Sequence, residues 1–310
     1  MSLVLFIDLI KYVFDPELGS NMSELIKLAL FFSATHVLTK SKISQRQLET
    51  LLITGSFSYV CILFLQFFEF GGFLNLIATM NLDETRAMDI FAGGRLPGWG
   101  QDVNVGTICL VSLLVPKIRL IKSRLNSNRF INLFLLTDII CIILMQSRTG
   151  VMMLCIILFW EYRSKMLISI PIVAALLTMQ SLPYLTYGYQ ALINGENLSL
   201  IIRLGQWSLA LTEVKANLLL GLDEITLGMR VLDSDIVKSL YLFGIIGPLV
   251  ISLIPAYYLG FTNSSSFYVF IVFIVYSVLN AFVLGYQTNA AAIMLFSSLL
   301  IIQKLSGEKK

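Results

Sequence analysis

The feature that most constrains the fold of this chain is a series of apolar runs, most of them about long enough to cross a lipid bilayer. A membrane-spanning helix needs about 20 mostly apolar residues. Over the whole chain, 57% of the residues are hydrophobic and only 13% are charged, and the mean hydropathy is +0.82. Soluble domains carry about 25% charged residues. We therefore predict an all-α, polytopic transmembrane helical bundle, with residues 1–310 forming a single integral membrane domain.

The apolar runs predict about ten membrane spans. They lie near residues 3–14, 22–38, 48–70, 99–116, 130–146, 148–160, 166–182, 236–258, 267–284 and 287–303. The first run is short and contains Asp8 and Lys11, so it is the weakest candidate. Almost nothing separates the fifth run from the sixth, which predicts a tight hairpin at residues 147–150.

The positive charges predict the orientation of the bundle, because short cytoplasmic loops carry an excess of Lys and Arg. These residues gather in segments 39–47, 117–129 and 161–165 and in the tail from Lys304 to Lys310. Counting ten spans puts all four places on one side, which we expect to be the cytoplasm. The carboxyl terminus is then cytoplasmic. The two long loops, at 71–98 and 183–235, are then external.

The larger external loop contains a helical pattern. Between 200 and 214, apolar residues recur at alternating spacings of four and three, the period of an α-helix. They are Leu200, Leu204, Trp207, Leu211 and Val214. Arg203, Gln206 and Glu213 form a polar stripe roughly 100° around this helix. The predicted amphipathic helix could lie on the outer membrane surface with its apolar side down, or it could pack on the outer ends of the spans.

Four arginines fall on the predicted external side, against the positive-inside tendency. They are Arg95, Arg148, Arg203 and Arg230. A guanidinium forms bidentate, charge-assisted hydrogen bonds with phosphate and stays ionised at any working pH. An external arginine cluster would therefore suit a protein that handles a lipid pyrophosphate. The alternative is that these arginines pair with the acidic residues of the loops or with lipid head groups.

Four segments, taken in order, resemble those of a known family. QSRTG at 146–150 joins two apolar runs, and GRLPGWGQDVNVG at 94–106 is similar to an earlier loop-to-helix junction. RLGQWSLALTEVKANLLLGL at 203–222 lies in the large external loop, and DSDIVKSLYLFGIIGPLV at 233–250 returns to the membrane. Together they resemble the O-antigen polymerase and ligase superfamily of membrane glycan polymerases, over roughly residues 90–250.

The resemblance implies a glycosyltransferase that polymerises oligosaccharide repeat units carried on undecaprenyl pyrophosphate. The product would be O-antigen or capsular polysaccharide, made at the outer face of a bacterial cytoplasmic membrane. The implied enzyme has no nucleotide-sugar site and needs no cofactor and no metal. Its implied partners are the lipid-linked oligosaccharides, membrane lipids, a chain-length regulator and a flippase, and they do not include nucleic acid.

The resemblance also assigns roles to individual cations. Transfer displaces a lipid pyrophosphate from an anomeric carbon, so the reaction needs positive charge on the departing group. Arg148 and Arg203 are the expected catalytic arginines, and Arg95 and Arg230 are expected to bind substrate as well.

The remaining expected site residues belong to the same segments. The acceptor hydroxyl needs a base nearby, and Asp233 or Asp235 is the candidate, because both precede a predicted span on the external side. Ser147 and Trp207 are expected to contact substrate.

Two alternatives remain open. Ligases of this superfamily typically use a histidine in the large external loop, whereas the single histidine here, His36, lies in the predicted span at 22–38. That departure favours a polymerase. The other alternative is a multispanning transporter or flippase of lipid-linked sugars, which is expected to carry buried charges in several spans and to have matching halves. Asp138 lies in the middle of a predicted span, and we expect a structural role for it.

Overall fold

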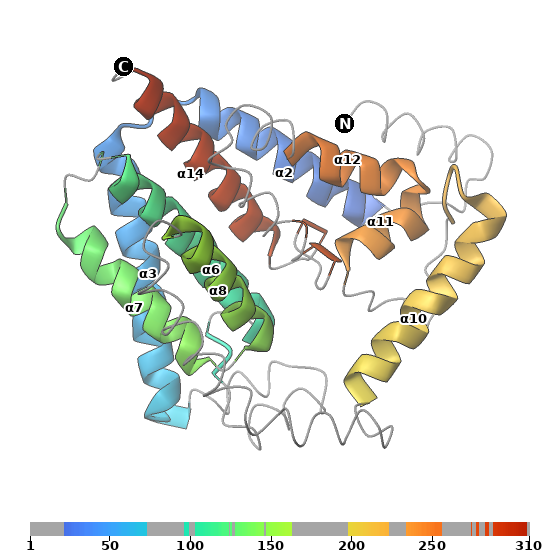
Figure 1. Ribbon diagram of the computed structural model, residues 1–310, viewed down its shortest axis with the longest axis horizontal. Helices are drawn as coiled ribbons and strands as arrows, with labels where there is room; N and C mark the ends of the chain where they lie inside the picture. Colours follow the sequence, from blue (N-terminus) through green and yellow to red (C-terminus); the bar gives the residue numbers. More distant parts are fainter. Residues whose placement is uncertain are drawn as a thin grey trace. The chain divides into compact units, whose positions relative to one another are not determined.

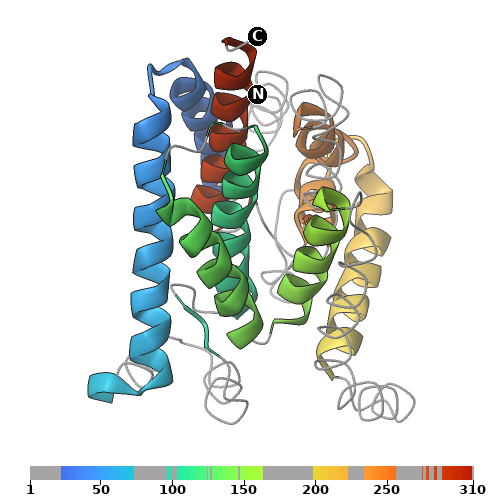
Figure 2. The ribbon, with the colours of Figure 1, turned by 60° about the vertical axis from the view of Figure 1, so that its left-hand side comes forward.

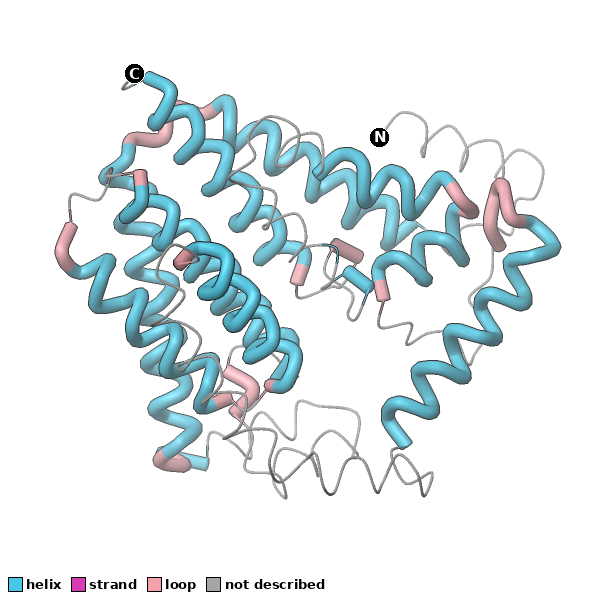
Figure 3. Tube along the Cα trace, viewed as in Figure 1, coloured by secondary structure: helices cyan, strands magenta, loops and turns pink. Residues whose placement is uncertain are grey.

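All regular elements in the part of the chain that the computed structural model describes are helices (Figures 1 and 3). The described residues are 22–72, 96–98, 103–123, 125, 128–145, 147–162, 198–222, 234–255, 274, 277–278, 283–284 and 288–308. Three helices are long and apolar enough to cross a membrane, namely α3 (Gln45–Phe67), α6 (Val103–Lys122) and α14 (Asn289–Glu308). Helices α7 (Phe130–Leu144) and α8 (Arg148–Glu161) are apolar but shorter. This part of the chain is therefore all-α and consistent with a membrane protein.

The predicted count of ten spans stays a prediction. The spans expected at 3–14 and 166–182 lie outside the described residues, and so does most of the one at 267–284. Where the fifth and sixth spans were predicted, α7 ends at Leu144 and α8 begins at Arg148. The turn predicted at 147–150 is therefore placed too late, because residues 148–150 belong to the first turn of α8.

The chain divides into two compact units, which are described separately. Unit 1 comprises residues 1–33 and 174–289, and unit 2 comprises residues 34–173 and 290–310. Unit 1 contains the first part of α2 (Met22–Lys40) and the elements α10 (Leu198–Val214), η4 (Lys215–Asn217), α11 (Asp235–Phe243) and α12 (Ile246–Pro255). Unit 2 contains α3, η2 (Phe70–Gly72), α6, α7, α8 and α14.

In unit 2, helix α6 packs against α3, α7 and α8 (Figure 2). Its apolar residues, such as Leu110 and Leu114, are fully buried. Helix α7 turns an apolar stripe outward, formed by Leu133, Leu136, Ile140 and Leu144. Some polar side chains, such as Lys117 and Asp138, are also buried in this unit. An apolar outer stripe around a core that contains polar groups is what a hydrocarbon solvent favours.

Unit 2 has a basic end and a hairpin end. Helix α3 begins at the basic end, where Ser44 caps it in a capping box with Gln47 and Gln45 donates to the carbonyl of Leu125. Helices α6, α8 and α14 end there (Figures 1 and 2), and Lys122 at the end of α6 pairs with Glu161 at the end of α8. The opposite end contains the α7–α8 turn and residues 96–98. The start of α3 and the ends of α6, α8 and α14 thus lie at one end of unit 2, which agrees with the predicted grouping of the basic segments on one side.

One part of the charge assignment is wrong. The sequence analysis ended the fourth span at Pro116 and counted Lys117 as a loop cation, but α6 continues to Lys122 and the Lys117 side chain is fully buried. Proline often ends a helix because it lacks an amide hydrogen. Here α6 continues through Pro116, and the Lys117 ammonium that follows finds an acidic partner, Asp138, inside the bundle.

The span predicted at 236–258 is wrong as a single helix, because it consists of α11 and α12 with a break at Gly244. Gly244 has φ 62° and ψ −158°, a conformation that is essentially restricted to glycine. A Cβ on this residue would also meet the backbone of Leu218 and Leu219. The amide of Ile245 donates to the carbonyl of Leu218 at 2.9 Å, so the backbone at the break is bonded to another segment.

Helix α10 covers the range in which the sequence predicted an amphipathic helix, but its buried side differs from the predicted stripe. Ala210 and Val214 are buried, whereas Leu211 is 44% exposed. Glu213, assigned to the polar stripe, accepts a hydrogen bond from the Tyr241 hydroxyl at 2.9 Å. The face of α10 that packs on α11 is therefore centred between the two predicted stripes.

Candidate functional site

The hairpin end of unit 2 joins two of the segments that carry the resemblance. Ser147 is the N-cap of α8, and its hydroxyl oxygen accepts the amide of Gly150 at 3.1 Å. The same hydroxyl donates to Oδ1 of Asn104 in the first turn of α6, at 2.9 Å. Arg148, the first residue of α8, follows directly. Ser147 thus fixes where α8, and with it the backbone of Arg148, begins relative to α6.

Two glycines permit this junction to close. A Cβ on Gly150 would overlap the methyl group of Thr107 in α6. A Cβ on Gly106 would overlap the carbonyl oxygen of Pro97 and the methyl group of Met145. Residues 97, 106, 107, 145 and 150 therefore pack at distances that larger side chains would prevent, which explains in physical terms why the two motifs contain glycine at these positions.

A buried glutamine holds the loop that precedes α6. Gln66, near the end of α3, accepts the amide of Gly98 at 2.9 Å and donates to the Gly98 carbonyl at 2.8 Å. Gly98 has φ 62°, and a Cβ there would lie 2.8 Å from the ring of Tyr59. The loop segment 96–98 is thus tied to α3 through its backbone. The sequence analysis missed Gln66, because a single glutamine at the end of an apolar run carries no motif.

Asp235, one of the two candidate bases, lies in unit 1 at the first position of α11 and is fully buried. Its Oδ2 accepts the amide of Val283 at 2.8 Å, and its Oδ1 accepts the amide of Leu284 at 2.9 Å. Asn289 donates to the carbonyl of Val283 at 2.7 Å, and the neighbouring Ser234 donates to the carbonyl of Ser277 at 3.1 Å. Asp235 therefore holds a non-helical stretch of main chain, a role that the sequence did not reveal.

The predicted site residues are distributed over both units. Ser147 and the backbone of Arg148 lie in unit 2, whereas Trp207, Asp235 and the backbone of Arg203 lie in unit 1. Trp207 is half-buried, and its indole Nε1 is buried without a hydrogen-bond acceptor. Arg95, Arg230 and Asp233 lie outside the described residues, as do the side chains of Arg148 and Arg203. The convergence of the arginines in one pocket stays a prediction.

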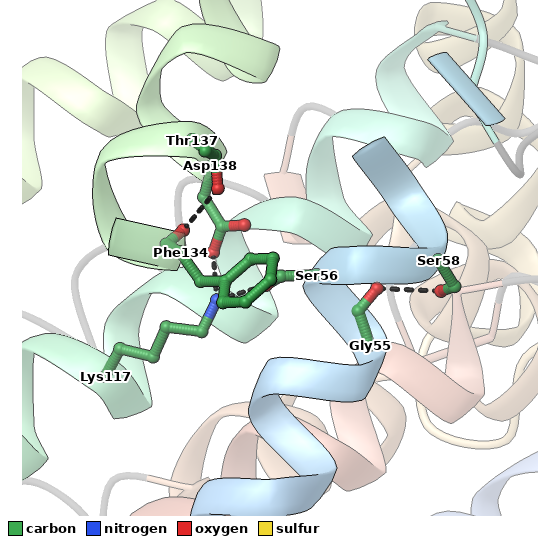
Figure 4. A network of polar contacts seen from close by, with 7 residues as sticks. All are labelled: Gly55, Ser56, Ser58, Lys117, Phe134, Thr137 and Asp138. Atoms are coloured by element: carbon green, nitrogen blue, oxygen red, sulfur yellow. Dashed lines mark hydrogen bonds and ion pairs between the residues drawn. The ribbon is translucent and has the colours of Figure 1, made fainter. Parts of the chain in front are cut away.

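Asp138, for which a structural role was expected, belongs to a buried polar network in unit 2 whose other members were not predicted (Figure 4). Lys117 of α6 is 2.6 Å from Oδ2 of Asp138 in α7, and its ammonium also donates to the Ser56 hydroxyl of α3. All three side chains are fully buried, and the Phe134 ring lies 6.0 Å from the Lys117 ammonium. The sequence contains a signal for this pair, since Asp138 lies inside an apolar run and Lys117 lies directly beside another. Because the predicted span ended at Pro116, Lys117 was assigned to a loop and was not considered as a partner of Asp138.

The basic end of unit 2 contains a second group of charges. Glu161 pairs with Arg119 at 3.1 Å and with Lys122, and Lys122 lies 5.6 Å from the centre of the Tyr162 ring. Burial and the Glu161 carboxylate raise the pKa of the Tyr162 hydroxyl, which therefore stays protonated at neutral pH. These ion pairs tie the ends of α6 and α8 together.

The four cysteines, Cys61, Cys109, Cys141 and Cys155, are free thiols. Within the described ranges, no group of three or more His, Cys, Asp and Glu side chains is placed to hold a metal ion. Comparisons with protein-family models, with curated proteins and with solved structures found no match to this chain.

Proposed function

We propose that this chain polymerises undecaprenyl-pyrophosphate-linked oligosaccharide repeat units at the outer face of a bacterial cytoplasmic membrane. The observation that carries the proposal is the hydrogen bond between Ser147 and Asn104. It joins two of the segments on which the resemblance rests and puts Arg148 at the start of α8. A polymerase that holds a lipid pyrophosphate at the membrane face needs a cation fixed in this way.

Arg148 suits the departing pyrophosphate for two reasons. A guanidinium forms bidentate bonds with phosphate oxygens, and the N-terminus of a helix favours anions through its free amide groups and its dipole. Arg203, Arg95 and Arg230 are the further cations of this proposal, provided that they reach the same anion. Arg148 then stabilises the negative charge that develops as the glycosidic bond to the carrier breaks.

Asp233 is the better candidate for the base. Each carboxylate oxygen of Asp235 already accepts a backbone amide, so these hydrogen bonds would have to break before either oxygen could approach an acceptor hydroxyl. In this proposal Asp235 positions the chain, and Asp233, two residues earlier, accepts the proton of the attacking hydroxyl.

The two ends of unit 2 support the orientation that this chemistry needs. Lys40, Lys42 and Arg46 belong to the basic end and are exposed there. Since cytoplasmic ends of spans carry the excess of Lys and Arg, the basic end is the cytoplasmic one in this proposal. The α7–α8 turn and Arg148 then face outward, where the lipid-linked repeat units would be joined.

The substitution Arg148→Ala tests the proposal. In cells that make surface glycan, we expect the variant to display single repeat units on the surface and to lose the long chains, because the pyrophosphate loses its cation. Arg148→Lys keeps one charge without the bidentate geometry and should recover only part of the chain length. Arg46→Ala, which removes an exposed arginine from the basic end, is the matched control and should leave long chains unchanged.

Two results would contradict the proposal. Normal chain length in Arg148→Ala, Arg203→Ala and Arg230→Ala would mean that the arginines do not act on the carrier. Complete absence of surface glycan in Arg148→Ala, with the protein present at normal level in the membrane, would indicate that repeat units fail to reach the outer face.

That second outcome would favour a transporter or flippase of lipid-linked sugars, and one observation supports this alternative. Transporters are expected to carry charged residues inside their spans, and the buried pair Lys117–Asp138 is such a feature. The two charges neutralise each other and link three helices, which a structural role also requires. For this reason we place the polymerase first.

A further inference from the structure

The segment that follows α10 exposes leucine side chains. Residues 218–222 have the sequence LLLGL and contain no charge. Leu218, Leu219 and Leu220 are 47%, 71% and 44% exposed. We call residues 218–222 the leucine turn. Three consecutive exposed leucines would be unfavourable in water, at about 25 cal/mol for each Å² of apolar surface.

The main chain of the leucine turn is bonded to the break between α11 and α12. The amide of Leu222 donates to the carbonyl of Tyr241 at 2.7 Å, and the carbonyl of Leu218 accepts the amide of Ile245 at 2.9 Å. Gly221 has φ 74°, and a Cβ on it would lie 2.5 Å from the amide nitrogen of Gly244. Two glycines thus allow the two backbones to meet directly, and the leucine turn is fixed against this break.

The exposed leucines continue an apolar stripe on α12. Leu249 and Leu253 are four residues apart and so lie on one face of α12, and Ile245 directly precedes the helix at the same interval. Ile245, Leu249 and Leu253 are 43%, 48% and 56% exposed. Because Ile245 is bonded to Leu218, the leucine turn and the stripe adjoin. Continuous exposed apolar surfaces of this kind mark contacts with a membrane or with another protein.

We propose that the leucine turn lies in the hydrocarbon region of the bilayer and that lipid acyl chains contact Leu218, Leu219 and Leu220. In a bilayer, non-helical backbone is tolerated only where its polar groups find partners within the protein. The two bonds to α11 and α12, together with the bond from the Gly221 amide to the carbonyl of Asn217 at 2.7 Å, give the amides of Gly221 and Leu222 and the carbonyl of Leu218 partners within the protein, as this placement needs.

This placement goes beyond the proposed function and does not depend on it. It means that the region predicted as an external loop at 183–235 re-enters the membrane at its leucine turn. The turn anchors the carboxyl end of α10 at the bilayer, where Lys215 is exposed just before it and can extend its ammonium toward the head groups.

Site-specific photo-crosslinking in the otherwise unaltered full chain tests the placement. A benzophenone amino acid is introduced at position 219, the protein is reconstituted in phospholipid vesicles, and adducts formed on illumination are identified by mass spectrometry. We expect phospholipid acyl adducts at position 219, because this side chain is the most exposed of the turn. Position 249, on the exposed stripe of α12, should give the same adducts. Position 42, an exposed lysine in the turn between α2 and α3, should give none.

Two outcomes at position 219 would overturn the proposal. Crosslinks only to other peptides of this chain would show that protein covers the leucine turn, and the absence of any adduct would show that water surrounds it. Either outcome counts against the proposal in this way only if position 249 gives lipid adducts in the same preparation, because these adducts show that the probe reacts with lipid. If position 249 also fails, the apolar stripe of α12 does not face lipid, and the proposal is overturned for that reason.

Discussion

Unit 1 and unit 2 each bury an aspartate completely, and the described partners of the two carboxylates are of different kinds. In unit 2, Oδ2 of Asp138 lies 2.6 Å from the ammonium of Lys117. In unit 1, the two carboxylate oxygens of Asp235 accept the backbone amides of Val283 and Leu284. The Asp138 carboxylate forms an ion pair with a side-chain cation of a neighbouring helix, whereas the Asp235 carboxylate accepts hydrogen bonds from the main chain.

The difference follows from the state of the backbone around each residue. Asp138 lies among the continuous helices α3, α6 and α7, whose amides and carbonyls are bonded within each helix, so its available partners are side chains. Asp235 faces residues 283 and 284, which lie in a bend outside regular helix and have amides to satisfy. Gln66 obeys the same rule within unit 2, since it bonds the backbone of the non-helical Gly98. Asp235 and Gln66 thus both bond main-chain groups that an interrupted helix leaves without a helical partner.

The strongest test of the comparison is to remove one member of the side-chain pair. We expect Asp138→Leu to lower the free energy of unfolding by about 3–5 kcal/mol, because it leaves the Lys117 ammonium buried and unpaired. The double variant Asp138→Leu/Lys117→Met removes both charges and should recover most of that loss. Thermal or denaturant unfolding of the purified protein in detergent measures both changes.

The double variant also decides between the structural role of the pair and the transporter alternative. If the double variant is stable and supports normal surface glycan, the pair serves to hold α3, α6 and α7 together. If it is stable but no glycan reaches the surface, the charges have a role in transport. A double variant as unstable as Asp138→Leu would contradict the claim that the unpaired cation causes the loss.

The described partners of Asp235 are the backbone amides of Val283 and Leu284, which no side-chain substitution removes. We expect Asp235→Asn to lower the free energy of unfolding by about 1.5–3 kcal/mol, since one amide would lose a charged acceptor and face an NH2 group. Removal of a second side chain should not restore this stability. The same unfolding measurement, made beside that of Asp138→Leu, checks the expected order of the two effects.

Asp233→Asn is the matched control for Asp235→Asn. If Asp233 is the base, this variant should lose long glycan chains while its stability stays unchanged. If instead Asp233→Asn keeps long chains and Asp235→Asn loses them at unchanged stability, Asp235 is the base. That result would contradict the positioning role of Asp235.

The sequence predicted the helical membrane character of the chain and a hairpin between the fifth and sixth apolar runs, because both follow from the lengths of these runs. The turn itself was predicted at 147–150, whereas α7 ends at Leu144 and α8 already begins at Arg148. It did not predict that Lys117 pairs with Asp138, because a proline beside the lysine indicated the end of a span. The break at Gly244 was also missed, since glycine is common inside continuous transmembrane helices as well. Only the contact with Gly221 and Leu218, more than 20 residues earlier, explains the break. Such contacts between distant segments are not encoded in local periodicity.

The smallest expected effect concerns Ser147, whose hydroxyl bonds both backbone and side chain. Ser147→Ala should lower the free energy of unfolding by about 1 kcal/mol, the usual cost of losing an N-cap, whereas Ser147→Thr keeps the hydroxyl and should cost less. Asn104→Ala should show non-additivity with Ser147→Ala in a double-mutant cycle, because the two side chains share one hydrogen bond. If Ser147 positions Arg148, Ser147→Ala should also shorten the surface glycan, but less than Arg148→Ala does. Strictly additive stabilities in the cycle, together with normal glycan in Ser147→Ala, would mean that the two motif segments meet without acting on each other.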